Sequence, residues 1–421
     1  MPDTPRAFPT SIAKRTAPAF TLLAIGFLLL LTVAPALQAQ TYSVIHTFSG
    51  ADGSYPTSTL LLDRAGNLYG TTYGGGADDE GTAFQLKRAG SGWILSRLYS
   101  FDGAYGGDGA YPINYGGLVF GPDGAIYGTT QEGGIFSGSQ SLGTVFRLQP
   151  QPNRCQSFSC PWTNTIIHAF AGYPADGALP SGNVVFDATG NVYGTTTENA
   201  GPGSIFELTR SNGGWTESII PSPNAGPFSA GLAIDTVGNL YGASLYGSQN
   251  GREDGSIFQL VPSGSGWTTN ILYSFTGGAD GKFPMGGVVL DHAGNIYGTT
   301  YEGGTESGGT VFQLAPSNGG YTFHLLCSFS GNRGPQSALT IDAAGNLYGT
   351  TEYDGDGSAG SAFKVTNTGA GWTCTTLYNF QLGNGGLAPV GGLTVDANGN
   401  IFGTASGGGA NGNGVIFEIT Q

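Results

Sequence analysis

Apolar and polar stretches follow one another along this chain in a block that recurs seven times after residue 50. Each block holds an apolar run, a polar turn, a Gly-Asn-aliphatic-Tyr-Gly-Thr-Thr stretch or a variant of it, a glycine-rich gap, and a second apolar run. The aromatic-glycine steps lie 48 to 66 residues apart, at Tyr69, Tyr127, Tyr193, Tyr241, Tyr297, Tyr348 and Phe402. This period is typical of a propeller blade of four short strands and is long for a solenoid repeat.

Four β segments can be read within the fifth block. Residues 287–291 form an apolar run that suits a strand buried on both faces. Residues 291–295 predict a tight turn in which Asp291 caps backbone amides. In the second strand, residues 295–300, Gly298 leaves room for a neighbouring side chain. A third strand follows at residues 310–314, and a fourth follows a polar turn.

Aromatic residues recur at fixed places in the last two segments. The third strand always carries a phenylalanine three residues after a glycine, which indicates a core position: Phe84, Phe146, Phe206, Phe258, Phe312, Phe363 and Phe417. The fourth segment begins with an aromatic residue: Trp93, Trp162, Trp215, Trp267 and Trp372, with Tyr321 and Tyr42 in the same slot of the other two copies. One aromatic per blade at one height favours packing between blades over a sugar-stacking role.

The two ends of the chain carry complementary fragments of one blade. The last block supplies three strands and stops, whereas residues 42–48 match a fourth strand but precede any first strand. Pairing them satisfies the backbone groups along residues 415–420. The sequence therefore predicts an all-β fold, a seven-bladed β-propeller of four-stranded antiparallel blades, closed by the N-terminal strand on the C-terminal blade.

The first 39 residues predict an export signal. Arg6, Lys14 and Arg15 precede an apolar run at residues 20–34, and Ala39 offers a small residue for cleavage. The alternative is an uncleaved membrane anchor, although the run is shorter than the ~20 residues that a span needs. We expect residues 1–39 to be a signal peptide, residues 40–421 to be the propeller, and the protein to be secreted, periplasmic or on the cell surface.

Four cysteines fit an exported protein. Cys155 and Cys160 flank four residues and predict a disulfide in an oxidising compartment. Cys327 and Cys374 fall at different heights on outer strands of neighbouring blades, so two separate thiols are expected there.

The chain is acidic, with a formal net charge of −14 and a charged fraction of 10%. Basic patches that would follow phosphates are missing, which argues against nucleic acid and anionic membranes as partners. The 12% of periodic aromatic residues provide the apolar area that a disordered chain lacks.

The repeat unit resembles a known family. The stretches Gly66 to Thr72 with Gly81 to Leu86, and Gly294 to Thr300 with Gly309 to Leu314, are similar to the Gloeo/Verruco tandem repeat of exported bacterial proteins. The resemblance covers nearly all of residues 41–421. It implies a propeller-like repeat protein and brings no catalytic residues with it.

Acidic residues are the candidate binding groups. Asp63, Asp187, Asp235, Asp342 and Asp396 repeat the position of Asp291 and are expected to cap turns. A second set precedes the inner strands in a D-G-x-x-P pattern or follows the second strands, and both places open on one end of the channel. The members proposed for ligand binding are Asp52, Asp108, Asp176, Asp280, Glu132, Glu198 and Glu302. The alternative is that these are solvated loops.

Metal and cofactor chemistry has weak support. The acidic end could hold Ca²⁺, and Asp354 with Asp356 has some likeness to an EF-hand loop but lacks its ligand spacing. His46 and His168 are expected to be outer-strand residues, and no pair of histidines has the spacing of a zinc site. No other cofactor is expected.

Three functions stay open at this point. The leading hypothesis is an exported, non-catalytic, monomeric module that binds a glycan or a cell-surface protein. The second is a propeller hydrolase or lyase that uses channel-mouth carboxylates, with or without a metal ion. The third is a surface-structural module. Fold alone does not choose among them.

Overall fold

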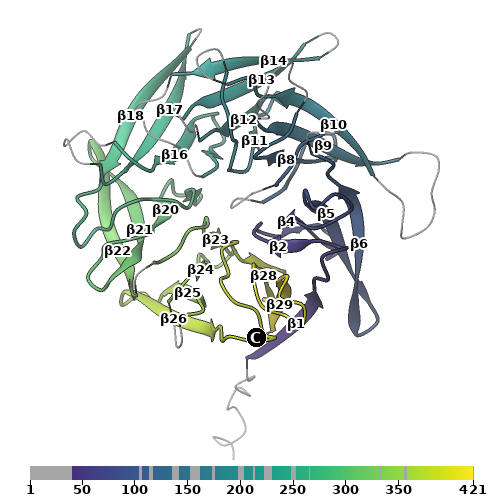
Figure 1. The fold of residues 1–421 in the computed structure, drawn as a ribbon. Helices are drawn as coiled ribbons and strands as arrows, with labels where there is room; N and C mark the ends of the chain where they lie inside the picture. The colour runs from purple at the N-terminus through teal and green to yellow at the C-terminus, as the bar shows by residue number, and fades with distance from the viewer. Residues whose placement is uncertain are drawn as a thin grey trace, which may run out of the picture. The chain divides into compact units, whose positions relative to one another are not determined.

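Residues 40–420 form a closed ring of seven antiparallel sheets (Figure 1). The structure, a computed structural model, describes these residues except 104–106, 113–116, 135–141, 152–161, 173–175, 198–202, 212–213, 222–229, 248–252, 265, 332 and 355–357. Within this described part, no helix has the length and apolar character needed to cross a bilayer. The predicted seven-bladed propeller is confirmed.

The strands of each blade fall into four layers from the axis outward. The inner strands are β3 (Leu61–Leu62), β7 (Val119–Phe120), β11 (Val185–Phe186), β15 (Ala233–Ile234), β19 (Val289–Leu290), β23 (Thr340–Ile341) and β27 (Thr394–Val395). The second strands are β4 (Leu68–Gly74), β8 (Ile126–Thr130), β12 (Val192–Thr195), β16 (Leu240–Ser244), β20 (Ile296–Thr300), β24 (Leu347–Thr351) and β28 (Ile401–Ala405).

The third strands carry the second apolar run of each repeat, with its core phenylalanine. They are β5 (Thr82–Ala89), β9 (Thr144–Pro150), β13 (Ile205–Ser211), β17 (Ser256–Ser263), β21 (Ser307–Ser317), β25 (Ser361–Asn367) and β29 (Val415–Thr420). The outer strands are β6 (Gly92–Ser100), β10 (Trp162–Ala169), β14 (Gly214–Ile220), β18 (Gly266–Ser274), β22 (Gly320–Ser330), β26 (Trp372–Asn379) and β1 (Thr41–Thr47). A short extra strand, β2 (Ser54–Pro56), also pairs with β4. Blades are numbered 1 to 7 in the order of their inner strands.

The ring closes as the sequence predicts. Strand β1 lies antiparallel to β29, with Thr41 opposite Thr420 and Thr47 opposite Val415 (Figure 1). The amide of Phe48 then donates a hydrogen bond to the carbonyl of Gly414 at 3.1 Å. Blade 7 therefore contains both ends of the propeller, and the edge of β29 is covered.

The Tyr-Gly step makes room for the core phenylalanine of the same blade. Gly298 lies opposite Phe312, and a Cβ at this glycine would lie 2.6 Å from the phenylalanine Cζ. The same approach of 2.4–2.6 Å recurs in all seven blades. Each of the seven core phenylalanines is at most 1% exposed. These two predictions about the repeat are confirmed.

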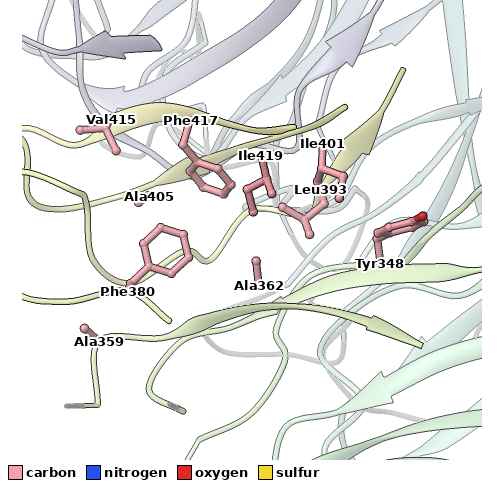
Figure 2. Packing of buried hydrophobic residues seen from close by; sticks show 10 residues of the cluster. All are labelled: Tyr348, Ala359, Ala362, Phe380, Leu393, Ile401, Ala405, Val415, Phe417 and Ile419. Atoms are coloured by element: carbon pink, nitrogen blue, oxygen red, sulfur yellow. The ribbon is translucent and has the colours of Figure 1, made fainter. Parts of the chain in front are cut away.

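The hydrophobic core lies between neighbouring sheets. Figure 2 shows the cluster between blades 6 and 7, where Phe380 of blade 6 packs against Phe417 of blade 7 with ring centroids 5.1 Å apart. The cluster contains Tyr348, Ala359, Ala362, Phe380, Leu393, Ile401, Ala405, Val415, Phe417 and Ile419. Because each blade buries its faces only against its neighbours, the ring must be complete before every blade has a full core.

The outer-strand tryptophans pack between blades, as predicted. Trp162 contacts Tyr69 of blade 1 at 6.2 Å between centroids, and Trp267 contacts Tyr193 of blade 3 at 5.7 Å. The assignment of Tyr42 to the same slot is wrong. Tyr42 lies opposite Ile419, two residues further along its strand than the tryptophan slot would require. It stacks instead on Tyr378 at 3.7 Å.

Cys327 of β22 and Cys374 of β26 form a disulfide with Cα atoms 5.8 Å apart, so the prediction of two separate thiols is wrong. The two residues do lie at different heights, Cys327 opposite Val311 and Cys374 opposite Val365. The outer strands of neighbouring blades are offset along their length, and this offset brings the two heights together. The predicted bridge between Cys155 and Cys160 lies outside the described residues.

The same two heights meet at other blade junctions. We call two such residues a junction pair. The first lies on the outer strand of one blade, opposite the residue that precedes the core phenylalanine of that blade. The second lies on the outer strand of the next blade, opposite the residue two positions after the core phenylalanine of that next blade. Tyr273 and Phe323 form the junction pair of blades 4 and 5, and their rings stack at 4.8 Å. Tyr378 and Tyr42 form that of blades 6 and 7. Each pair links two outer strands.

The polar turn before each second strand is organised by its aspartate. Asp291 Oδ1 accepts hydrogen bonds from the amides of Ala293 and Asn295, both at 2.9 Å. Its Oδ2 accepts bonds from Asn295 Nδ2 at 2.7 Å and from the Tyr297 hydroxyl at 3.1 Å. The same capping by Asp63, Asp187, Asp235, Asp342 and Asp396 confirms the predicted turn role.

Candidate functional site

The D-G-x-x-P loops form joints between blades. In the loop into blade 2, Pro112 packs on Gly81 of blade 1, where an added Cβ would lie 2.7 Å from the proline Cδ. The residue before the proline is held at a positive φ of 52–56° in four such loops, at Tyr55, Tyr111, Leu179 and Phe283, and also at Ala388 in the corresponding loop into blade 7, which lacks the aspartate. This conformation is costly for a residue with a side chain. It is held by hydrogen bonds such as that from the Tyr111 amide to the Glu80 carbonyl, 2.9 Å long.

The aspartates of these loops accept hydrogen bonds from their own loop and from the preceding outer strand. Asp52 binds the Ser49 amide at 2.8 Å and His46 Nε2 at 3.0 Å. Burial opposes ionisation of Asp52, but these bonds outweigh it and lower its pKa. Asp280 accepts bonds from the Tyr273 hydroxyl at 3.0 Å and the Thr276 amide at 2.9 Å. The loop geometry therefore depends on these carboxylates.

Asp108 differs in its electrostatics. It accepts bonds from the Tyr99 hydroxyl and from the Asp102 amide, the latter at 3.1 Å. Burial and the neighbouring Asp102 carboxyl raise the pKa of Asp108 to about 6. The structure places Asp52, Asp108, Asp176 and Asp280 at four separate blade junctions and does not bring them together. Their predicted role in ligand binding stays a prediction.

The predicted acids that follow second strands are also dispersed. Glu302 pairs with Lys282 Nζ at 2.9 Å. Glu132 contacts the loop that enters its own blade through its backbone carbonyl, which accepts a 2.8 Å bond from the Ala110 amide. Asp354 Oδ1 accepts a 3.4 Å bond from the Ser330 hydroxyl. Glu198 and Asp356 lie outside the described residues. The central cavity, about 390 Å³, is lined mainly by inner-strand residues such as Ile234, Leu290 and Ile341 and by the residues just before them, and no carboxylate is among its described lining residues.

Asp176 belongs to a cluster that spans two blades. His168 of β10 places Nε2 3.2 Å from Asp176 Oδ2 and 3.7 Å from Glu217 Oε2 of β14. Burial, with Asp176 beside it, raises the pKa of Glu217 to about 9. Burial opposes ionisation of Asp176, but hydrogen bonds with His168 and Glu217 outweigh it and lower its pKa. His168 and Glu217 are the junction pair of blades 2 and 3.

An open pocket lies between blades 3 and 4, at the opposite end of the strands from the D-G-x-x-P loops. Its volume is about 720 Å³, within the range of about 300–1,000 Å³ of small-molecule sites. Turns of both blades and Trp267 form its walls, and its acidic lining residues are Asp187, Glu207 and Asp235. The pocket therefore combines an aromatic surface with several carboxylates.

Blade 3 departs from the repeat inside this pocket. In blades 1, 4 and 5 the residue after the core phenylalanine is a glutamine whose Nε2 donates to the tyrosine hydroxyl of the second strand, as from Gln259 to Tyr241 at 2.8 Å. That hydroxyl in turn donates to the turn aspartate. Blade 3 has Glu207 at this position, so an acceptor replaces the donor.

The consequence is one donor between two carboxylates. The Tyr193 hydroxyl lies 3.0 Å from Glu207 Oε1 and 3.1 Å from Asp187 Oδ2, yet it carries a single hydrogen. Burial and these two carboxylates raise the pKa of Tyr193, so the hydroxyl stays protonated. At any moment one of the two oxygens lacks the tyrosine hydrogen. The pocket is therefore set up to accept hydrogen bonds from a ligand.

In blade 7 the residue that corresponds to Glu207 is covered by neighbouring side chains. Glu418 corresponds to Glu207, but it forms an ion pair with Arg88 of blade 1 and is within 3.4 Å of Trp93 Nε1. In blade 1, Arg88 lies opposite Trp93. The corresponding residue opposite Trp267 in blade 4 is Pro262, which carries no charge. Among the described residues, Glu207 forms no ion pair, and the pocket in front of it stays open.

Comparison with known proteins agrees with this architecture. The model of the Gloeobacter/Verrucomicrobia repeat matches residues 31–224 and 229–421. The chain belongs to this repeat family. No curated protein matches this member of the Gloeobacter/Verrucomicrobia repeat family.

Solved structures share the fold of this family member. The extracellular domain of a candidate one-component system from B. thetaiotaomicron has a TM-score of 0.53 at 12% identity, over 89% of this chain and 39% of that chain. This chain thus spans well under half of that protein. A candidate 6-phosphogluconolactonase from Bacteroides uniformis has a TM-score of 0.50 at 13% identity, over 80% and 88% of the two chains. At these identities the likeness shows the fold alone.

Sequence reasoning missed two residues of these two sites, Glu207 and Glu217. Glu207 carries a visible signal, because it stands where three other copies of this Gloeobacter/Verrucomicrobia repeat have glutamine. For Trp267 the sequence favoured packing between blades over a sugar-stacking role, and Trp267 does pack on Tyr193 while also lining the pocket. Glu217 gave no signal, because its contact with His168 depends on the offset between outer strands.

Proposed function

We propose that this chain is an exported, non-catalytic propeller that binds a saccharide in the pocket between blades 3 and 4. The observation that carries the proposal is the replacement of a glutamine donor by Glu207 beside Asp187 and Trp267. A sugar hydroxyl would supply the hydrogen that the Tyr193 hydroxyl cannot give to both carboxylates. An aromatic ring such as that of Trp267 provides an amphipathic surface for the apolar face of a sugar ring.

Export is supported by chemistry at two places in the chain. The apolar segment at residues 20–34 follows basic residues, as in secretory signals. The disulfide between Cys327 and Cys374 belongs to an oxidising compartment. A saccharide outside the cytoplasm is therefore the ligand class that suits both the pocket and the compartment.

The test compares binding with stability in one variant. Glu207→Gln restores the residue of blades 1, 4 and 5, so the variant should fold as well as the parent or slightly better. Its affinity for any glycan found on a glycan array should fall at least tenfold by calorimetry. Glu302→Gln, an acid at the opposite end of the strands, is the matched control and should bind normally.

Three results would contradict the proposal. Equal glycan affinity in Glu207→Gln and the parent would remove the pocket from the binding site. Loss of binding in Glu302→Gln, or in the Asn variants of Asp52 and Asp280, would favour the other end of the propeller, as the sequence predicts. Cleavage of a bound oligosaccharide by the parent protein would favour the hydrolase or lyase hypothesis.

A further inference from the structure

The cluster of His168, Asp176 and Glu217 has the composition of a metal site. One imidazole nitrogen and two carboxylate oxygens converge from β10, from the loop that follows it, and from β14, and all three ligand atoms lie within 4.8 Å of one another. The side chains are 18%, 8% and 12% exposed, in that order. They are thus shielded from water while the cluster stays close to the outer surface of the ring.

The two distances from His168 Nε2 agree with one ion shared by the three side chains. A tetrahedral Zn²⁺ with bonds of about 2.0–2.2 Å places its ligand atoms about 3.3–3.6 Å apart. His168 Nε2 is 3.2 Å from Asp176 Oδ2 and 3.7 Å from Glu217 Oε2. Three protein ligands with a fourth position left for water match known zinc sites. Ca²⁺ prefers oxygen ligands alone, so the histidine argues against it.

A second observation concerns the remaining oxygen of Glu217. Glu217 Oε1 is buried and has no hydrogen-bond partner. A buried polar atom without a partner is costly, and native structures rarely leave one unsatisfied. A cation bound through both oxygens of Glu217 would supply the partner that Oε1 lacks, whereas no hydrogen bond within the cluster reaches Oε1.

The place of the cluster in the fold supplies the third argument. His168 and Glu217 are a junction pair, and this pair is a disulfide between blades 5 and 6 and a stacked ring pair between blades 4 and 5. The fold therefore brings these two positions within bonding reach. We propose that His168, Asp176 and Glu217 bind a divalent transition-metal ion, best matched by Zn²⁺, that ties the outer strands of blades 2 and 3 together.

The chain contains its own control. His46 and Asp52 at the junction of blades 7 and 1 repeat the contact of His168 with Asp176, at 3.0 Å. The third position there is Leu95, which lies opposite Leu86 as Glu217 lies opposite Leu208. This junction has two of the three ligands and is not expected to hold the ion.

The experiment titrates Zn²⁺ into tag-free, chelator-treated full chain by calorimetry. The parent should bind one equivalent, and His168→Ala and Glu217→Leu should each lower the affinity at least a hundredfold. His46→Ala should leave binding unchanged, and Leu95→Glu should add a second equivalent. Failure of the parent to bind Zn²⁺ saturably at 100 μM would overturn the proposal, as would full binding in both cluster variants or a single equivalent in Leu95→Glu.

A measurement on the parent protein keeps the proposal testable if the variants do not fold. X-ray absorption of the zinc-loaded parent should show one imidazole and oxygen ligands in the first coordination sphere. A first sphere without imidazole, or with sulfur, would place the ion elsewhere. Neither result depends on saccharide binding, because the cluster and the pocket share no residue.

Discussion

Substitution of Gly298 by alanine tests the packing rule that underlies all seven blades. The added Cβ would lie 2.6 Å from Phe312 Cζ, 3.0 Å from Cε1 and 3.3 Å from a Val288 methyl carbon. Carbon atoms in favourable contact are about 3.5–4.0 Å apart. The ring of Phe312 must therefore move by about 1 Å, yet it is fully buried between two sheets.

The expected cost follows from overpacking of a core. Extra methyl groups in a well-packed interior typically cost about 1–3 kcal/mol. With an unfolding entropy of about 2.1 cal/mol/K per residue and roughly 380 residues, this cost corresponds to a fall in Tm of about 1–4 °C for cooperative unfolding. The effect is small in degrees because the whole ring contributes to the entropy.

Chemical denaturation of four proteins measures the effect: parent, Gly298→Ala, Phe312→Leu and the double variant. Leucine lacks the Cζ atom, so the double variant should regain at least 1 kcal/mol relative to the sum of the single changes. Gly92→Ala is the control, since its Cβ would meet only a carbonyl oxygen at 3.9 Å. A neutral Gly298→Ala, or additive single effects, would refute the packing rule.

Three further predictions concern closure, acid and redox state. Deletion of residues 40–49 removes the fully buried Phe48 and bares β29, so stability should fall by at least the roughly 3–5 kcal/mol of a Phe→Ala change, and unchanged unfolding midpoints would contradict this. Burial opposes ionisation of Asp63, Asp187, Asp291 and Asp342, but hydrogen bonds from asparagine and tyrosine, and at Asp187 also from Thr189, outweigh it and lower their pKa values. Their contribution is complete above the unfolded pKa of 3.8 and is lost as pH falls through the lower folded values, so denaturation midpoints should drop below about pH 4, and less so in Asp291→Asn. Reduction of the Cys327–Cys374 bridge, which closes a loop of 47 residues, should cost about 4 kcal/mol, and equal midpoints with and without reductant would disprove the bond.

The fold could be predicted because the sequence pattern of one blade recurs in seven copies. Three features recur in the copies: a period of four strands, a buried glycine beside a core phenylalanine, and a turn aspartate. Such repetition is not expected by chance. Ring closure followed from counting, since β29 ended one blade a strand short and residues 42–48 had no blade of their own. Local pattern and global topology agreed, as expected for a minimally frustrated sequence.

The junctions between blades could not be predicted in the same way. Alignment of repeats compares residues at equal heights, whereas the offset of the outer strands joins residues at unequal heights. Cys327 and Cys374 were expected to stay apart for this reason, and the same offset hid the contact of His168 with Glu217. Tyr42 was assigned to the wrong slot because its short strand was aligned by sequence alone. The pairing with the C-terminal strand, in which Tyr42 lies opposite Ile419, sets the register instead.

The offset also explains why the disulfide, the ring stacks and the polar cluster lie between blades. A residue in the middle of a blade is fixed by the repeat, because its neighbours are the same in every copy. The contact at a junction pair involves only two side chains. Substitution of these two residues can therefore give a disulfide, a ring stack or a polar cluster without disturbing the sheets. The third-strand position of Glu207 behaves similarly, since its glutamine counterparts contribute a single hydrogen bond to the network. In a symmetric ring, a binding site needs such a break in symmetry. Positions that differ between copies while their surroundings stay constant are therefore the places to search for function in other members of the family.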